Sequence, residues 1–544
     1  MKEKEAMRAS GVLLPVSALP SRYGIGSFSK EAFEFVDQLR AAGQKYWQIL
    51  PLGPTGYGDS PYQSFSTYAG NPYYIDLETL IQEGLLTEKE CEAADFGDNE
   101  QYVDYEKIYY ARFEILRKAF DRFVPNKAFE EFKEENAWWL EDYSLYMAIK
   151  NSLKGISWIE WEDDLKQRKP EVLEEKREAL AEEIQFVRFQ QYEFSTQWKK
   201  LKDYANENGI RIIGDIPIYV AFDSADTWAN PQLFQFDEEC TPLAVAGCPP
   251  DAFSATGQLW GNPLYRWDYH KETGFQWWIQ RLRYCFQLYD VVRVDHFRGF
   301  DEYYAIPYGD ETAEFGKWQK GPGIELFEAV KKELGEVDII AEDLGYLTES
   351  VLKLVRDTGY PGMKVLQFAF DSREESDYLP HNYGHNCVVY TGTHDNNTIL
   401  GWLDEMAPED KALAVKYMNN AHTPKKELPW DFIRLALASV ADLAVIPVQD
   451  YLCLGGEARV NKPSTLGNNW KWRLLPGQIT EELTEKIYDM TKLYGRLPAE
   501  RKEDNAEEEA QEAEDKESKE DIKEDIKKET KEEAKEEQNE NAGA

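Results

Sequence analysis

One stretch decides the fold of this chain: Val291-Val292-Arg293-Val294-Asp295-His296-Phe297-Arg298-Gly299. It begins as a β-branched apolar run long enough for one buried strand, and it changes within two residues to a carboxylate, an imidazole and a guanidinium. In parallel α/β sheets and barrels, substrate sites are assembled at the carboxyl ends of the strands. Asp295 is therefore the first catalytic candidate, although an Asp–Arg ion pair that caps a strand would produce the same local pattern.

Seven other segments have the same apolar character, and each is flanked by a helical pattern or by a long insertion. Together they give eight predicted strands, at residues 11–16, 46–52, 210–218, 291–297, 338–344, 363–368, 388–393 and 443–449. Eight strands that alternate with helices predict an α/β fold, the (β/α)8 TIM barrel, here with large helical and loop insertions after its strands. A doubly wound sheet is compatible with the same periodicity.

The spacing of the strands predicts how the chain is divided. We expect residues 1–500 to form one catalytic barrel, with subdomains inserted at about 53–209 and 219–288 and no C-terminal β-sandwich. Residues 173–208 have helical spacing and end at a helix-stop signal. Residues 501–544 hold 19 acidic and 9 basic residues and little apolar surface, which predicts a disordered acidic tail.

The formal net charge of −39 argues against partners that need a basic surface, so we expect no nucleic acid and no membrane partner. A neutral substrate fits this charge better. Aromatic residues make up 14% of the chain, and their flat faces suit both a protein core and the apolar faces of sugar rings.

Six cysteines are scattered without the close pairing of zinc sites or the density of a small secreted scaffold, so we expect reduced thiols. The first residues lack the apolar region of a signal peptide, and no run approaches eighteen apolar residues. The sequence predicts a cytoplasmic protein.

Two other predicted strands end in carboxylates, like the first. The strand at 338–344 carries Glu342, and the strand at 388–393 leads into His394 and Asp395. If the three strands belong to one barrel, their carboxyl ends share a rim, and Asp295, Glu342 and Asp395 converge. An acid pair that faces a neutral, polyhydroxylated substrate indicates glycosidic-bond chemistry, in which one carboxylate attacks the anomeric carbon and the other protonates the leaving oxygen.

Such a pair must titrate at different pH values. Arg293 lies two residues before Asp295, on the same side of the strand, and is expected to hold Asp295 ionised. Glu342 lies beside Asp343 in an apolar strand, which is expected to raise its pKa toward that of an acid catalyst. Metal ligation by the same carboxylates is the competing interpretation. It is weakened by the lack of a clustered histidine motif or a calcium-loop pattern, so we predict no metal and no cofactor.

Two polar loops and one late segment could bind a polyol. Residues 53–64 follow the second strand and include Tyr57 and Ser60, although an ordinary loop would have similar composition. Residues 247–263 include Asp251, Gln258 and Trp260, and their glycines would allow a lid. After the last strand, residues 457–473 carry Asn461.

The motifs at 53–64, 214–220, 249–263, 293–299, 341–345 and 391–397 closely resemble one family. It comprises the 4-α-glucanotransferases called amylomaltase or disproportionating enzyme, glycoside hydrolase family 77 of the α-amylase clan. The resemblance spans residues 10 to 498. It implies retaining transfer of a 1,4-α-D-glucan segment to the 4-hydroxyl of glucose or a malto-oligosaccharide, through a covalent glycosyl-enzyme. The implied partners are malto-oligosaccharides, glycogen or starch, with glucose as an acceptor.

The resemblance also implies roles for single residues. Asp295 resembles the nucleophile, Glu342 the general acid/base, and Asp395 the carboxylate that holds sugar hydroxyls and stabilises the transition state. The implied substrate-binding residues are Arg293, His394, Asp215, Tyr57, Ser60, Asp251, Gln258, Trp260 and Asn461. The chain departs from the usual pattern at Ala252, where many members have tyrosine, and in its acidic tail.

Two functions of other classes are alternatives to the transferase. A glucan hydrolase of the α-amylase type would use all three acids and differ in accepting water instead of a sugar hydroxyl. A non-catalytic glucan-binding protein has no need of all three.

If Asp295 is a nucleophile, its carboxyl group is expected about 5–5.5 Å from that of Glu342, instead of the roughly 6.5–9.5 Å of an inverting pair.

Overall fold

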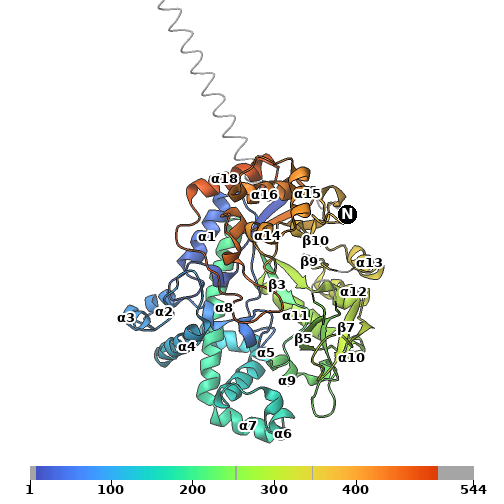
Figure 1. Ribbon diagram of the computed structural model, residues 1–544. Helices are drawn as coiled ribbons and strands as arrows, with labels where there is room; N and C mark the ends of the chain where they lie inside the picture. Colours follow the sequence, from blue (N-terminus) through green and yellow to red (C-terminus); the bar gives the residue numbers. More distant parts are fainter. Residues whose placement is uncertain (1–7, 251–253, 346, 500–544) are drawn as a thin grey trace, which may run out of the picture.

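Eight parallel strands close into a barrel at the centre of the molecule (Figure 1). The computed structural model describes residues 8–250, 254–345 and 347–499, and the predicted tail lies outside them. Each barrel strand pairs with the barrel strand that follows it in the sequence, and the last barrel strand pairs with the first. The strands are β1 (Ala9–Leu13), β2 (Tyr46–Gln48), β3 (Arg211–Pro217), β6 (Val291–Asp295), β9 (Ile339–Ala341), β10 (Gly362–Val365), β11 (Cys387–Tyr390) and β12 (Leu443–Pro447). The predicted TIM barrel and its eight strands are confirmed.

Side chains along the barrel strands alternate between its interior and the surrounding helices. The interior is filled by a compact apolar cluster: Leu13, Ile213, Val291, Ile340, Met363, Val365, Val388, Tyr390 and Val445. Because side-chain direction repeats every two residues, the polar residues two or four positions after these apolar residues also face inward. Asp215 follows Ile213, Arg293 and Asp295 follow Val291, and Glu342 follows Ile340. The alternation thus aims four charged groups into the carboxyl end of the barrel.

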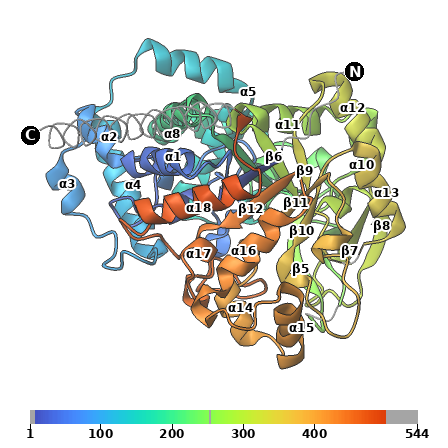
Figure 2. The ribbon, with the colours of Figure 1, turned by 90° about the horizontal axis from the view of Figure 1, so that it is seen from above.

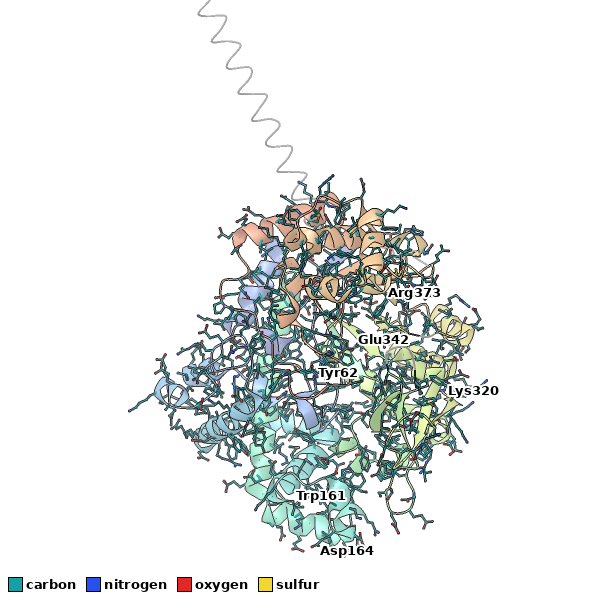
Figure 3. All side chains as sticks on the ribbon, in the orientation of Figure 1. Tyr62, Trp161, Asp164, Lys320, Glu342 and Arg373 are labelled. Carbon is teal, nitrogen blue, oxygen red and sulfur yellow. The ribbon has the colours of Figure 1, made fainter. Side chains whose placement is uncertain are left out.

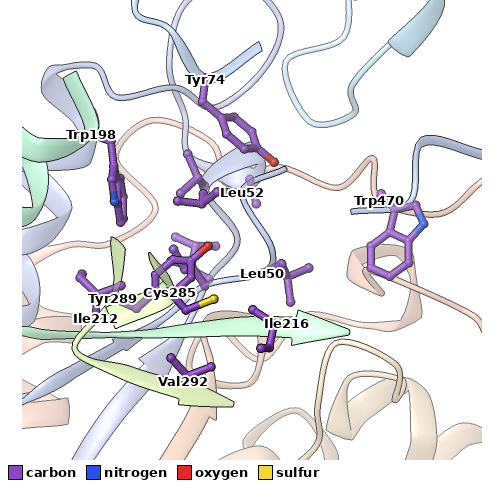
Figure 4. Packing of buried hydrophobic residues seen from close by; sticks show 14 of the residues in the cluster. Leu50, Leu52, Tyr74, Trp198, Ile212, Ile216, Cys285, Tyr289, Val292 and Trp470 are labelled. Carbon is purple, nitrogen blue, oxygen red and sulfur yellow. The ribbon is translucent and has the colours of Figure 1, made fainter. Parts of the chain in front are cut away.

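The outward-facing residues of the strands pack against helices. Figure 4 shows Ile212 and Val292 on the face of the sheet that Trp198 and Cys285 cover. Trp198 belongs to α8 and Cys285 to α11. This packing is the larger of the hydrophobic cores and joins the barrel to its insertions.

The α-helices surround the barrel and build its insertions (Figure 2). Their bounds are α1 (Lys30–Ala41), α2 (Leu77–Gln82), α3 (Glu88–Glu92), α4 (Tyr105–Arg122), α5 (Lys127–Ser152), α6 (Asp163–Lys166), α7 (Pro170–Ala179), α8 (Ala181–Glu207), α9 (Ala225–Ala229), α10 (Trp267–Glu272), α11 (Gln276–Leu288), α12 (Ile324–Leu334), α13 (Glu349–Thr358), α14 (Ile399–Glu405), α15 (Pro408–Met418), α16 (Leu428–Ala438), α17 (Val448–Tyr451) and α18 (Glu481–Leu493). The helical prediction at 173–208 is confirmed by α7 and α8. None of the helices in the described part of the chain is long and apolar enough to cross a membrane.

Between β2 and β3 the chain inserts α2 to α8, which lie to one side of the barrel in Figure 1. Helix α8 contacts α1, α4, α5 and β3, and so connects this insertion to the barrel wall. The insertion also carries the loop with Tyr62, which is labelled in Figure 3 near the middle of the molecule.

A second sheet lies beside the barrel and was not predicted. Its antiparallel strands run in the order β5, β4, β7 and β8, with bounds β4 (Ala244–Cys248), β5 (Gln258–Pro263), β7 (Glu302–Pro307) and β8 (Lys317–Lys320). Since β4 pairs with β7, the segment after β3 and the segment after β6 share one sheet. Part of this sheet lacks the buried apolar run by which the barrel strands were predicted, since β8 is exposed along its whole length. The division of the chain into inserted subdomains at 53–209 and 219–288 stays a prediction.

We predict that Gly214 is essential to the packing of β3. A Cβ atom placed there would lie 2.2 Å from Cγ of Tyr289, whose ring is buried. Gly214→Ala is therefore expected to destabilise the protein by about 1–3 kcal/mol through overpacking. Gly384→Ala is the matched control, because its Cβ would meet nothing within 4 Å. Equal urea midpoints for the two variants would contradict this account.

Candidate active site

A cleft of about 490 Å³ opens at the carboxyl ends of the barrel strands. It is lined by residues that follow β6 and β11, by loops of the insertions, and by the segment after β12. The predicted site residues on its wall are Ser60, Gln258, Trp260, Asp295, His394, Asp395 and Asn461. The structure thus brings together residues that lie up to several hundred positions apart.

Arg293 and Asp215 lie beneath the cleft and form a buried ion pair. Nη1 of Arg293 donates to both carboxylate oxygens of Asp215, at 2.7 and 2.6 Å. Nη2 of the same guanidinium lies 3.1 Å from Oδ1 of Asp295. The exposed fractions of the Arg293 and Asp215 side chains are 3% and 0%, so the pair is shielded from water. One buried cation therefore contacts two of the predicted site carboxylates.

Asp295 and Glu342 occupy equivalent positions on adjacent strands. In the parallel register of β6 and β9, Val294 is paired with Ala341, and each acid is the next residue. Oε2 of Glu342 accepts a hydrogen bond of 2.7 Å from the backbone N–H of His296, and Oε1 accepts one of 2.8 Å from that of Leu344. The carboxyl group of Glu342 is thus held by main-chain donors beside Asp295.

Burial governs the protonation of both acids. It raises the pKa of Glu342 to about 7, and the negative charge of Asp295 adds to this effect. It also raises the pKa of Asp295 to about 6, against the opposing effect of Arg293. Arg293 lowers the pKa of Asp295 as expected, but burial outweighs the guanidinium, so the net shift is upward. The expected rise for Glu342 agrees with this geometry.

Asp395 is oriented by side chains from two segments. Oδ1 accepts a hydrogen bond of 2.6 Å from Nδ2 of Asn461 and lies 3.4 Å from Nε2 of His394. The backbone carbonyl of Asp395 accepts a further bond from Arg459 at 2.7 Å. Asn461 was predicted to bind substrate, and here it holds the third carboxylate. With Oδ1 engaged, Oδ2 of Asp395 is the oxygen left to meet a ligand in the cleft.

Loop residues complete the wall of the cleft. The indole N–H of Trp260 donates to Oε1 of Gln258 at 3.1 Å, so these two predicted residues support each other. The Ser60 hydroxyl accepts from the backbone N–H of Tyr62 at 3.3 Å. Of the remaining candidates, Asp251 and the side chain of Tyr57 lie outside the described residues, as does Ala252.

Tyr62 and His296 are cleft residues that were not among the candidates. The Tyr62 hydroxyl donates to Oδ2 of Asp215 at 2.9 Å, and its ring stacks on His394 with centroids 5.2 Å apart. The His296 ring meets Trp260 edge-on at 4.8 Å. Both residues belong to quoted motifs, but only their contacts distinguish them from ordinary loop residues.

Groups of three or more His, Cys, Asp or Glu side chains that could hold a metal ion are absent from the part of the chain that the structure describes. The absence of a metal stays a prediction, which chelation with EDTA can test, and the absence of a cofactor stays a prediction as well. The site carboxylates are instead engaged by Arg293, Asn461 and backbone N–H groups.

Comparison with known proteins points to one family. A family model described as 4-alpha-glucanotransferase, of glycoside hydrolase family 77, matches residues 14–479. A 4-alpha-glucanotransferase of Clostridium butyricum is 51% identical over 485 residues, which are 88% of this chain and 99% of that protein. One of Thermus thermophilus is 48% identical over 504 residues, covering 91% and 100%. The solved structure of amylomaltase from Streptococcus agalactiae in complex with acarbose has a TM-score of 0.88 at 42% identity, covering 90% of this chain and 100% of that one.

We predict that Arg293 stabilises the fold only as the partner of buried acids. Arg293→Met leaves Asp215 buried without its cation and is expected to cost about 3–5 kcal/mol in the free energy of unfolding, measured in urea. Adding Asp215→Leu removes the orphaned charge, so the double variant is expected to be more stable than the sum of the single losses predicts. Strictly additive losses would refute this coupling.

Proposed function

Because this chain belongs to the 4-alpha-glucanotransferases of glycoside hydrolase family 77, we propose that the cleft binds a 1,4-α-D-glucan and that Asp295, Glu342 and Asp395 transfer a segment of it. The acceptor is the 4-hydroxyl of glucose or of a malto-oligosaccharide. The observation that carries the assignment of residues is the position of Asp295 beside Glu342 on adjacent barrel strands, with Asp295 and Asp395 on the wall of the cleft.

The proposed reaction has two steps. In the first, a carboxylate oxygen of Asp295 bonds to the anomeric carbon while the bond from that carbon to the glycosidic oxygen breaks. Glu342 gives its proton to the departing oxygen. In the second, ionised Glu342 takes the proton of the acceptor 4-hydroxyl, whose oxygen displaces Asp295 from the anomeric carbon. Two inversions keep the α configuration of the linkage.

The strand register supports a retaining pair. Neighbouring strands lie about 4.8 Å apart, and Asp295 and Glu342 hold equivalent positions on neighbours. Inverting pairs need room for a water molecule and are separated by roughly 6.5–9.5 Å. The short spacing of 5–5.5 Å expected for a nucleophile and its acid stays a prediction that this register favours.

The protonation preferences suit these roles. With a pKa near 7, Glu342 holds a proton to donate around neutral pH, and the lower pKa of Asp295, near 6, leaves it ionised. Asp395 is oriented through Oδ1 by Asn461, which leaves Oδ2 to accept from sugar hydroxyls. Trp260 and Tyr62 add aromatic surface to the cleft, where the apolar faces of sugar rings can pack.

The proposed setting is the cytoplasm, with glycogen, starch or maltodextrins as the donors and glucose as one acceptor. Its support is chemical: Cys91, Cys240, Cys285, Cys387 and Cys453 are free thiols, as in a reducing compartment. A hydrolase of the α-amylase type would share the carboxylates, but the family relationship does not favour it.

Maltotriose as the single substrate tests the proposed function. A transferase produces glucose and a ladder of longer oligosaccharides, whereas a hydrolase produces glucose and maltose only. We predict the ladder for the natural chain. Asp295→Asn is expected to lose activity by several orders of magnitude, because the amide cannot attack the anomeric carbon. The matched control Asp203→Asn changes an exposed acid of α8 and should leave the ladder unchanged. Near-normal turnover by folded Asp295→Asn would refute the nucleophile.

We predict a bell-shaped pH dependence of kcat/KM. Asp295 must be ionised, so activity falls as the pH drops below its pKa of about 6. Glu342 must be protonated, so activity falls as the pH rises above its pKa of about 7. Because the acids interact, the two limbs report the pair rather than either residue alone. A flat profile from about pH 5 to 8, with circular dichroism unchanged, would be inconsistent with this assignment of acid and base.

A further inference from the structure

His296 has a backbone conformation that is uncommon for a residue other than glycine. It follows Asp295 directly and lies in the left-handed region, with φ 53° and ψ 47°. Residues with a Cβ atom seldom adopt this conformation; Gly adopts it most readily, and Asn, Asp and His adopt it more often than other residues do. Strained conformations of this kind persist where the surrounding structure enforces them, and they are concentrated at functional sites.

The left-handed turn presents two consecutive N–H groups to the same residue. The N–H of His296 donates to Oε2 of Glu342 at 2.7 Å, and the N–H of Phe297 donates to the backbone carbonyl of Glu342 at 3.0 Å. In an extended strand, consecutive N–H groups would point to opposite sides. A left-handed residue beside right-handed ones makes them converge into a donor nest. The conformation of His296 thus serves Glu342 directly.

The imidazole ring contributes packing and no charge. It lies against Trp260 edge-on at 4.8 Å, on the wall of the cleft. Burial lowers the pKa of the ring to about 3, with a smaller effect of Arg298 in the same direction. The ring is therefore neutral at any pH at which the enzyme would work, and its removal leaves the charge beside Glu342 unchanged.

We propose that His296 is a positioning residue that acts through its main chain: its left-handed conformation orients the carboxyl group of Glu342 by donating the backbone N–H to Oε2. The proposal rests on the acid/base role of Glu342 in the proposed function. The N–H of Leu344 holds Oε1. Together the two donors fix the plane of the carboxyl group and leave the remaining lone pairs for proton transfer in the cleft.

The same donors influence protonation. Hydrogen bonds from Leu344 and His296 lower the pKa of Glu342 and so oppose the effect of burial. The charged groups that face Glu342 are Asp295 and Arg293 on β6, and Tyr378 is the titratable group that faces it from the link between β10 and β11. Substitution of His296 changes none of these. Loss of the His296 donor should therefore move the basic limb of the pH profile to higher pH, as well as reduce kcat.

Two pairs of variants separate the main chain from the ring. Each removes the imidazole, but His296→Asn and His296→Gly retain access to the left-handed conformation, whereas His296→Val and His296→Ala disfavour it. Because all four variants lose the ring, the comparison is made among them: we expect kcat on maltotriose to be higher, and the basic limb to lie at lower pH, in His296→Asn and His296→Gly than in His296→Val and His296→Ala. In His296→Val, we expect kcat to be about 10²-fold lower than in His296→Asn, as for a misplaced catalytic group, and the basic limb to lie at higher pH. His296→Ala is expected to lie between these two variants.

Changes in KM should be similar in all four variants, because each loses the same ring from the cleft. Circular dichroism and urea unfolding identify a variant that fails to fold. If His296→Val fails to fold, His296→Ala replaces it in the comparison. If His296→Asn and the folded variant that disfavours the left-handed conformation, His296→Val or His296→Ala, have equal kcat and equal basic limbs, the inference is overturned while the maltotriose ladder remains. Absence of the ladder in the natural chain would instead overturn the proposed function, and the inference with it.

Discussion

The buried guanidinium of Arg293 is the interaction on which the site depends. A carboxylate taken out of water costs several kcal/mol unless it is paired, and Asp215 is fully buried. Arg293 meets both oxygens of Asp215 and also approaches Asp295. The β3–β6 register makes this possible by placing Asp215 opposite Arg293 on adjacent strands. The barrel can therefore hold several acids in one mouth, because one of its inward positions carries a cation that water cannot screen.

The insertions contribute more than walls. Tyr62 comes from the long helical insertion, yet its hydroxyl donates to Asp215 and its ring covers His394. Trp260 comes from the second sheet and packs against His296, next to the proposed nucleophile. The insertions thus bring aromatic rings to the acids, whose pKa values are raised mainly by burial.

Much of the fold could be predicted from the residues alone. Buried strands are short apolar runs, and the carboxyl ends of parallel strands share one rim, so Asp295, Glu342 and Asp395 could be assigned to one site. The second sheet was not predicted, and its strand β8 has no apolar run that could have indicated it, because β8 is exposed along its whole length. The contact of Asn461 with Asp395 escaped as well, since nothing in either segment indicates the other.

The sequence by itself determined which strands form, which face of each is polar, and which acids reach the rim, because these depend on alternation within single strands. Only the tertiary structure decided what surrounds those acids. The partner of Asp215 lies in another strand, and Tyr62 reaches it across 153 residues. The net upward shift of the Asp295 pKa could not be foreseen for the same reason. A neighbouring arginine is visible in the sequence, whereas desolvation is set by every segment that closes over the site.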